Sequence, residues 1–107
     1  MRKTPIPAQV SEEALRIVDR FNKKLGKTGY RYVPRFKGKY LYLDRDDGGT
    51  VGPICRLEYL GGKRGWSFAI YKYSDNCYDQ DEWMFPGSEC VDGTIEGAMK
   101  AGMQAYP

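Results

Sequence analysis

The sequence contains no histidine, and this absence removes most of the common catalytic and metal-binding arrangements. Without histidine there is no imidazole general base and no Ser–His or Cys–His pair to activate a nucleophile. The three cysteines, Cys55, Cys77 and Cys90, show no C-x-x-C spacing, so a zinc site is not predicted. An odd number of thiols without a signal-peptide pattern indicates reduced cysteines and a cytoplasmic location. We expect no cofactor and lean against an enzyme.

Long apolar runs and glycine-rich phosphate-binding motifs are also missing. No stretch approaches the roughly 18 apolar residues of a membrane-spanning helix, so no membrane association is expected. The 107 residues, 41% of them hydrophobic and 29% charged, have the size and balance of one soluble domain. Pro5 and Pro7 oppose helix formation, which predicts a flexible N-terminal arm over 1–9 and a single domain over 10–107.

Periodicity and turn signals predict an α+β fold, with an N-terminal helix, a four- to five-stranded antiparallel sheet and a C-terminal helix. Ser11 is the predicted N-cap of the first helix and Gly26 follows its end, while Thr94 is the predicted cap of a helix that runs to about residue 105. Each helix has one apolar face, so both are expected to pack on the same side of the sheet. The predicted strands cover about 29–36, 39–45, 53–60 and 66–73, with a weaker edge strand at 81–85.

Charge is distributed unevenly along the chain although the net charge is only +3. Residues 1–45 hold 12 Lys+Arg and 4 Asp+Glu, a net charge of +8, whereas residues 46–107 hold 5 and 10, a net charge of −5. If the two halves fold to different surfaces, the molecule is electrostatically two-sided. If the antiparallel sheet mixes the halves, the asymmetry cancels. Both outcomes are open at this point.

The stretch YRYVPRFKGKYLYLDR, residues 30–45, combines five aromatic and five basic residues with one acid. Gly38 suits the first position of a two-residue type II′ turn, with Lys39 as the second. Because side chains alternate along a strand, this turn divides the stretch between two faces. The expected core face holds Tyr32, Pro34, Phe36, Leu41 and Leu43, and the expected outer face holds Arg31, Val33, Arg35, Lys37, Tyr40, Tyr42 and Asp44.

The next predicted hairpin sorts in the same way and adds residues to the outer face. Rings beside guanidinium groups on a sheet are typical of single-stranded nucleic acid binding, because bases stack on rings and phosphates meet the charges. A solvated face is the alternative, since Asp44 and Glu58 share it and can neutralise two of its arginines. The candidate ligand-binding residues are Arg31, Arg35, Lys37, Tyr40, Tyr42, Arg56, Tyr71 and Tyr73.

These residues predict a non-enzymatic binding module for single-stranded nucleic acid or another polyanion. The same tyrosine-rich face would also serve an adaptor or inhibitor that binds an acidic protein partner. A further alternative is a metal-dependent hydrolase, because carboxylates at the density of the segment SDNCYDQDEW can hold Mg²⁺ or Ca²⁺. An exposed acidic loop is the better interpretation of this segment. The candidate metal ligands are Asp75, Asp79, Asp81 and Glu82.

Three segments, GWSFAIYKYS, YDQDEWMFPG and DGTIEGAMKAGMQAYP, carry a resemblance over residues 65–107, with a fainter echo in VGPICRLEY. They resemble a family of small prokaryotic soluble proteins of unassigned function. The resemblance implies a small stand-alone domain and no catalytic residues. The element order is also similar to that of double-stranded RNA-binding domains. That family has a lysine cluster at the start of its last helix, where this chain has Thr94-Ile95-Glu96-Gly97.

Overall fold

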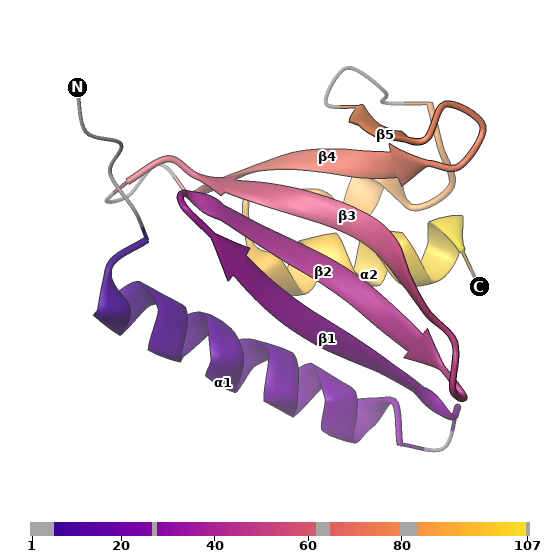
Figure 1. Cartoon of the computed structure of the whole chain (residues 1–107), viewed down its shortest axis with the longest axis horizontal. Helices are drawn as coiled ribbons and strands as arrows, with labels where there is room; N and C mark the ends of the chain where they lie inside the picture. Colours follow the sequence, from indigo (N-terminus) through magenta and orange to yellow (C-terminus); the bar gives the residue numbers. More distant parts are fainter. Residues whose placement is uncertain (1–5, 27, 62–64, 80–83, 107) are drawn as a thin grey trace.

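The chain folds into a five-stranded antiparallel sheet with two helices on one of its sides (Figure 1). The computed structural model describes residues 6–26, 28–61, 65–79 and 84–106. The strands follow one another in chain order across the sheet, as expected for strands joined by short turns. The predicted α+β class is therefore confirmed. The elements are α1 (Ala8–Lys24), β1 (Tyr30–Lys37), β2 (Tyr40–Asp47), β3 (Val51–Tyr59), β4 (Trp66–Lys72), β5 (Cys77–Asp79), the short 3-10 helix η2 (Ser88–Cys90) and α2 (Ile95–Ala105).

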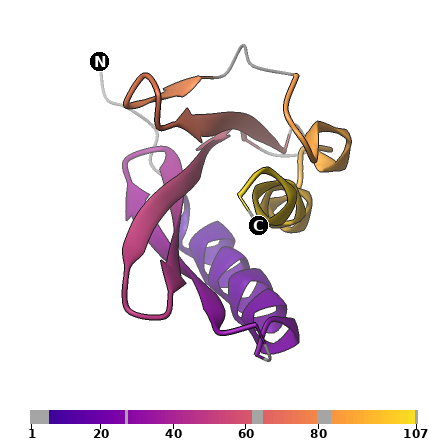
Figure 2. The same cartoon turned by 90° about the vertical axis from the view of Figure 1, so that its right-hand side faces the viewer.

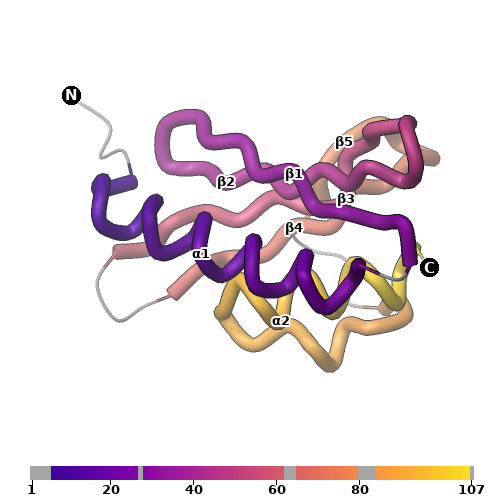
Figure 3. Tube along the Cα trace, turned by 90° about the horizontal axis from the view of Figure 1, so that it is seen from below, coloured from indigo at the N-terminus to yellow at the C-terminus, as the bar shows by residue number. Residues whose placement is uncertain are grey.

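The hydrophobic core lies between the sheet and the two helices. Figure 2 shows the sheet curving around α1 and α2, and Figure 3 shows the two helices side by side beneath it. The fully buried apolar side chains of β1, β2 and β3, such as Tyr32, Leu41, Leu43 and Leu57, lie on this side. The opposite side, called the open face from here on, has no helix over it among the described residues (Figure 2). The largest fully buried side chains are Tyr32, Leu41, Leu43, Leu57, Met99, Val18 and Cys55.

The hairpin between β1 and β2 has the predicted two-residue turn. Lys37 pairs with Tyr40, and Gly38 between them has a φ of 61°, a left-handed value that glycine adopts without strain. Lys39 does not share this positive φ, which fits a type II′ turn rather than type I′. The register that follows pairs Phe36 with Leu41 on the core side, so the predicted division of this stretch between faces is confirmed.

A β-bulge in β3 changes the alternation once. Leu43 pairs with Cys55 but Asp44 pairs with Pro53, so Ile54 is an extra residue in β3. Ile54 and Cys55 are both buried, at 3% and 0% exposure, although they are neighbours in the chain. Proline lacks a backbone donor, and a bulge is one of the few places where a central strand accepts it. The bulge thus supplies one more apolar side chain to the contact with α2.

Side chains close the outer edge of β1. The amide of Asn22 donates to the carbonyl of Tyr32 (2.9 Å), and the Tyr32 backbone N–H donates to Asn22 Oδ1 (2.7 Å). The next outward-facing backbone position is Pro34, which has no N–H to offer. At the start of the strand the Tyr30 N–H donates to Thr28 Oγ1 (3.0 Å). An edge satisfied in this way is a poor template for pairing with another strand.

The predicted start of the first helix is wrong. Helix α1 begins at Ala8, one turn before the predicted cap, and the Ser11 hydroxyl donates to the Ala8 carbonyl inside the helix instead of capping it. Pro7 occupies the N-cap position, where its missing N–H is no loss. Of the arm predicted over 1–9, residues 1–5 lie outside the described residues, and Ile6 donates its N–H to the Gly38 carbonyl (3.3 Å).

The fifth strand lies earlier than predicted. It covers Cys77–Asp79, because the chain reverses directly after β4 through a turn in which Asn76 has a φ of 54°. Residues 81–83 of the predicted strand 81–85 lie outside the described residues, and Met84 and Phe85 are not extended in the sheet.

Helix α2 begins as predicted and packs closely against the sheet. Thr94 Oγ1 accepts a hydrogen bond from the Gly97 N–H (3.0 Å), which is an N-cap. The buried Tyr32 hydroxyl donates to the Met99 carbonyl (2.8 Å) and thereby joins β1 to α2. Gly102 allows this approach, because an added Cβ would lie 2.5 Å from Tyr32 Oη and 2.6 Å from Ile54 Cγ2.

We expect Gly102→Ala to destabilise the fold despite the better helix propensity of alanine. The propensity gain is about 1 kcal/mol, whereas overpacking a rigid core costs about 1–3 kcal/mol and here also displaces the Tyr32 hydroxyl. Urea unfolding should show a lower midpoint for this variant. Gly26→Ala is the matched control, since its added Cβ meets nothing closer than 3.5 Å. Equal midpoints for the two variants would contradict the close packing of α2.

Candidate functional site

The open face carries a continuous row of four tyrosines, called the tyrosine array from here on. Ring centroids are 6.0 Å apart for Tyr40 and Tyr42, 5.5 Å for Tyr42 and Tyr78, and 5.0 Å for Tyr78 and Tyr71. The row crosses from β2 to β5, although its members lie up to 38 positions apart in the chain. Cross-strand ring contacts of this kind stabilise a sheet and hold each ring in place. The array is a fixed surface because each ring packs against another.

Arg56 lies in the middle of the array with its guanidinium against two rings. Its Cζ is 4.5 Å from the centroid of Tyr40 and 5.1 Å from that of Tyr78. No carboxylate of the described residues forms an ion pair with it. A guanidinium is planar, weakly hydrated and always charged, so it stacks on rings while its N–H groups stay available at the edge. Arg56 is therefore a positive charge held in place without being neutralised.

Arg35 provides a comparison on the same face. Its Cζ lies 4.5 Å from the centroid of Tyr42, but its Nε also donates to Asp44 Oδ2 at 3.1 Å. The hydrogen bond to Asp44 raises the pKa of Arg35, which is what a satisfied ion pair does. The predicted neutralisation by Asp44 is thus found for Arg35.

Glu58, the other acid expected to neutralise an arginine, pairs with a lysine instead. Its Oε2 lies 2.8 Å from Lys39 Nζ in the β1–β2 turn, and the hydrogen bond raises the pKa of Lys39. This pair joins the basic first half of the chain to the acidic second half, as does Lys24 with Glu96 at 3.5 Å. The charge asymmetry of the sequence is therefore offset in part by pairs between the halves.

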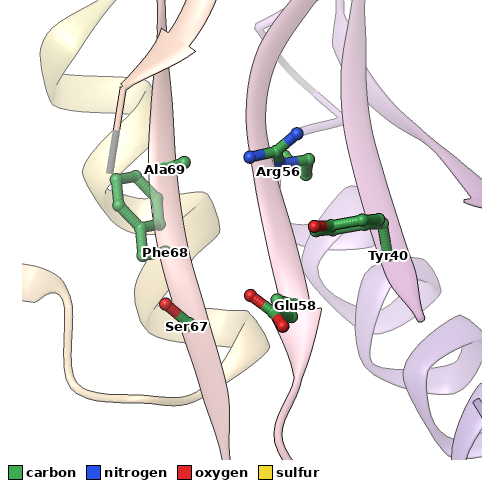
Figure 4. A pocket seen from close by; sticks show the side chains of 6 residues that line it. All are labelled: Tyr40, Arg56, Glu58, Ser67, Phe68 and Ala69. Carbon is green, nitrogen blue, oxygen red and sulfur yellow. The ribbon is translucent and has the colours of Figure 1, made fainter. Parts of the chain in front are cut away.

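Two depressions flank Tyr40 on the open face. A shallow indentation with no room for a water molecule lies between β3 and β4, with Arg56 and Glu58 on one side and the small side chains Ser67 and Ala69 opposite them (Figure 4). A wider depression of about 320 Å³ lies on the other side of Tyr40 beside the β1–β2 turn. Its lining residues are Lys37, Gly38, Lys39, Tyr40 and Tyr42.

The remaining predicted residues lie at the margins of the face. Arg31 lines a separate depression of about 290 Å³ between α1 and β1, together with Leu15 of the helix. Lys37 is exposed beside the turn and forms no ion pair with the described residues. Tyr73 follows the end of β4, where its hydroxyl donates to the Pro53 carbonyl (2.8 Å) and its ring meets Tyr71 at 4.9 Å. It belongs to the end of the sheet more than to its face.

Sequence reasoning missed Tyr78, whose ring contacts Tyr42, Tyr71 and Arg56 on the open face. Its signal was present, because Ser74-Asp75-Asn76 is a turn sequence, and a turn there places Tyr78 opposite Tyr71. Burial raises the pKa of Tyr78 to about 12, and the nearby Asp44 charge acts in the same direction.

Arg45 was also missed, and it lies on the core side of the sheet. It is 3% exposed, with its Nε 2.7 Å from Asp47 Oδ1 and its Cζ 4.5 Å from the ring centroid of Tyr30. Burial alone would lower the pKa of Arg45, but the hydrogen bond and the charge of Asp47 outweigh it and raise the pKa. This arginine is neutralised and has a structural role.

The acidic segment offers little to a cation in the part that the structure describes. Asp75 and Asp79 lie 3.8 Å and 3.7 Å from Lys72 Nζ, so both carboxylates share one ammonium group, which repels a second cation. Asp81 and Glu82 lie outside the described residues. Over residues 6–26, 28–61, 65–79 and 84–106, no three His, Cys, Asp or Glu side chains come together in a way that could hold a metal ion.

Two negative findings complete the description of the site. Among the described residues, neither helix combines the length and apolar character that crossing a membrane requires. No family model, curated protein or solved structure matches the chain.

The raised pKa of Tyr78 makes stability depend on pH in alkaline solution. An unfolded chain ionises tyrosine near pH 10, whereas folded Tyr78 keeps its proton until about pH 12. The unfolded state then binds fewer protons, so the free energy of unfolding falls between these pH values. Tyr78→Phe should reduce this fall, as measured by urea unfolding at several alkaline pH values. An unchanged fall would show that Tyr78 is not held in the array.

Proposed function

We propose that this protein is a non-enzymatic binding module whose open face holds single-stranded nucleic acid. The observation that carries the proposal is Arg56, whose guanidinium is held over the rings of Tyr40 and Tyr78 without a carboxylate partner. Such a group can donate paired hydrogen bonds to a phosphate or to a base edge. Arg35 and Arg45, by contrast, each pair with an aspartate.

The surroundings of Arg56 fit a flexible, anionic chain. The wider depression beside the β1–β2 turn adds the unpaired Lys37 and the edges of two rings of the array. The depression lies on one side of Tyr40, and the Arg56 guanidinium lies against the same ring. Single strands bind to such surfaces through phosphates and through stacking on rings or guanidinium planes.

Fluorescence anisotropy with labelled single-stranded RNA and DNA at low salt tests the proposal. Wild-type protein should bind, and Arg56→Ala should bind about ten- to a hundredfold more weakly, because a hydrogen bond to a charged group contributes about 1.5–3 kcal/mol. The slope of log affinity against log salt should also fall by about 0.7, the value for one phosphate contact on a single strand.

Arg16→Ala is the matched control for this measurement. It removes the same charge from an exposed position on α1, where Arg16 pairs with Glu13 (2.9 Å) far from the open face. We expect its affinity to stay close to wild type. Absence of binding at low salt, or an equal loss in both variants, would rule the proposal out. Capture of one protein partner in a nuclease-insensitive complex through the same face would favour the adaptor instead.

A further inference from the structure

We propose that the depression beside the β1–β2 turn is a second subsite for the bound single strand, with one phosphate at Lys37 and the adjoining base against the rings of Tyr40 and Tyr42. Arg56, which lies against the Tyr40 ring, then holds a different phosphate of the same strand. The inference rests on the proposed function and deepens it, because it assigns a second phosphate contact and the place where a base stacks.

The depression is the feature beside Tyr40 that has room for a ligand. Its volume of about 320 Å³ lies at the lower end of the roughly 300–1,000 Å³ of pockets that hold small molecules, which suits one nucleotide of a longer chain. The indentation between β3 and β4 has no room even for a water molecule. A base that enters the surface next to Tyr40 therefore does so at the turn, while the contact with Arg56 is made above the surface.

The two-residue turn keeps this space open. Gly38 lines the depression and is exposed, and a Cβ added to it would meet nothing within 4 Å. Its φ of 61° also favours glycine, so a side chain is not expected to fill the region. A backbone without a side chain allows a ligand to approach closely. The turn that sets the strand register thus also leaves a free approach to the depression.

Lys37 is the available charge of the depression. It is exposed and forms no ion pair with the described residues, whereas Lys39 at the same depression lies 2.8 Å from Glu58 Oε2. A lysine ammonium is a compact charge on a flexible stem, so it can follow a phosphate without a fixed hydrogen-bond geometry. Lys37 and Arg56 are therefore two cations near Tyr40 that no carboxylate of the described residues pairs with.

The acids of the open face do not cancel these two charges, because each has a basic partner of its own. Glu58 is paired with Lys39, and Asp44 lies 3.1 Å from Arg35 Nε. An unpaired carboxylate at either position would repel a phosphate. The ion pairs offset that repulsion and leave Lys37 and Arg56 to attract the backbone of the strand.

Tyr40 and Tyr42 give the depression a surface for a base. Their ring centroids are 6.0 Å apart and their planes are inclined by 29°. Both rings are half-buried, and each lies 4.5 Å from a guanidinium Cζ, that of Arg56 for Tyr40 and that of Arg35 for Tyr42. Bases stack on rings and on guanidinium planes, and stacking on a ring accepts any base because every base has a π-face.

Stacking at the depression requires an unpaired base. In a duplex the neighbouring base pairs cover both faces of a base, so a duplex can offer phosphates to Lys37 and Arg56 but no base to Tyr40 and Tyr42. We therefore expect a duplex to bind more weakly than a single strand of the same length.

Anisotropy with a labelled thymidine oligomer of about ten nucleotides tests the second phosphate contact. Lys37→Ala should weaken binding about two- to fivefold, as for an exposed ion pair, and should lower the slope of log affinity against log salt by about 0.7. The double variant with Lys37→Ala and Arg56→Ala should lower the slope by about 1.4, because each side chain contacts its own phosphate.

Lys100→Ala is the matched control. Lys100 is also exposed and forms no ion pair with the described residues, but it belongs to α2 on the covered side of the sheet. The variant loses the same charge from the whole protein, and both its affinity and its salt slope should stay close to wild type.

A chain without bases tests the stacking contact. An abasic deoxyribose-phosphate chain of the same length keeps every phosphate, and wild-type protein should bind it about five- to a hundredfold more weakly than the thymidine oligomer. Tyr42→Leu leaves the contact between Arg56 and Tyr40 in place and should reduce this difference.

The outcomes separate the subsite from the proposed function. If no strand binds at low salt, the proposed function fails. If Arg56→Ala lowers the salt slope but Lys37→Ala lowers it no more than Lys100→Ala does, the second subsite alone is overturned. An abasic chain or a duplex that binds as tightly as the thymidine oligomer overturns it as well.

Discussion

The division of side chains between the two faces of the sheet is the constraint on which the rest of the structure depends. The two-residue turn at Gly38-Lys39 sets the register of β1 and β2, and each later strand continues it. Both helices lie on one side, so a shift by one residue would turn Leu41 and Leu43 to solvent and Tyr40 and Tyr42 into the core. Burial of the apolar side chains fixes the register of the strands. The register in turn determines which tyrosine rings lie on the open face.

Three arginines of the sheet, Arg35, Arg45 and Arg56, show how the surroundings of a guanidinium decide whether its charge is neutralised. Arg45 is buried and its charge is matched by Asp47, since an unpaired cation at 3% exposure would be strongly unfavourable. Arg35 is stacked and paired on the open face. Arg56 is stacked only, with rings in place of a counter-ion. Rings orient a guanidinium without cancelling its field, so Arg56 keeps its attraction for an anion.

Sequence patterns predicted the fold because local signals and the global arrangement agree. The positive φ of Gly38, the cap at Thr94 and the small Gly102 are each visible in the sequence and each satisfied in the structure. The failures have identifiable causes. Ser11 is a good capping residue, but Pro7 begins the helix a turn earlier.

The candidate face was predicted less completely than the fold. Tyr78 was missed because a three-residue strand inside a polar segment carries too few side chains to show alternation. The partner of Glu58 was misassigned because ion pairing depends on side-chain reach across strands, which alternation does not specify. Arg45 falls on the same side of β2 as Leu41 and Leu43, yet it was not predicted there, because a charged residue is not normally assigned to a core. Its compensation by Asp47, two residues along the same strand, resolves that conflict.

The rigidity of the open face bears on what it can bind. Each ring of the array packs on a neighbour, and Arg56 is held by two of them, so little side-chain entropy remains to be lost on binding. A ligand must then adapt to the protein, and a single strand can do so because its bases turn freely outward.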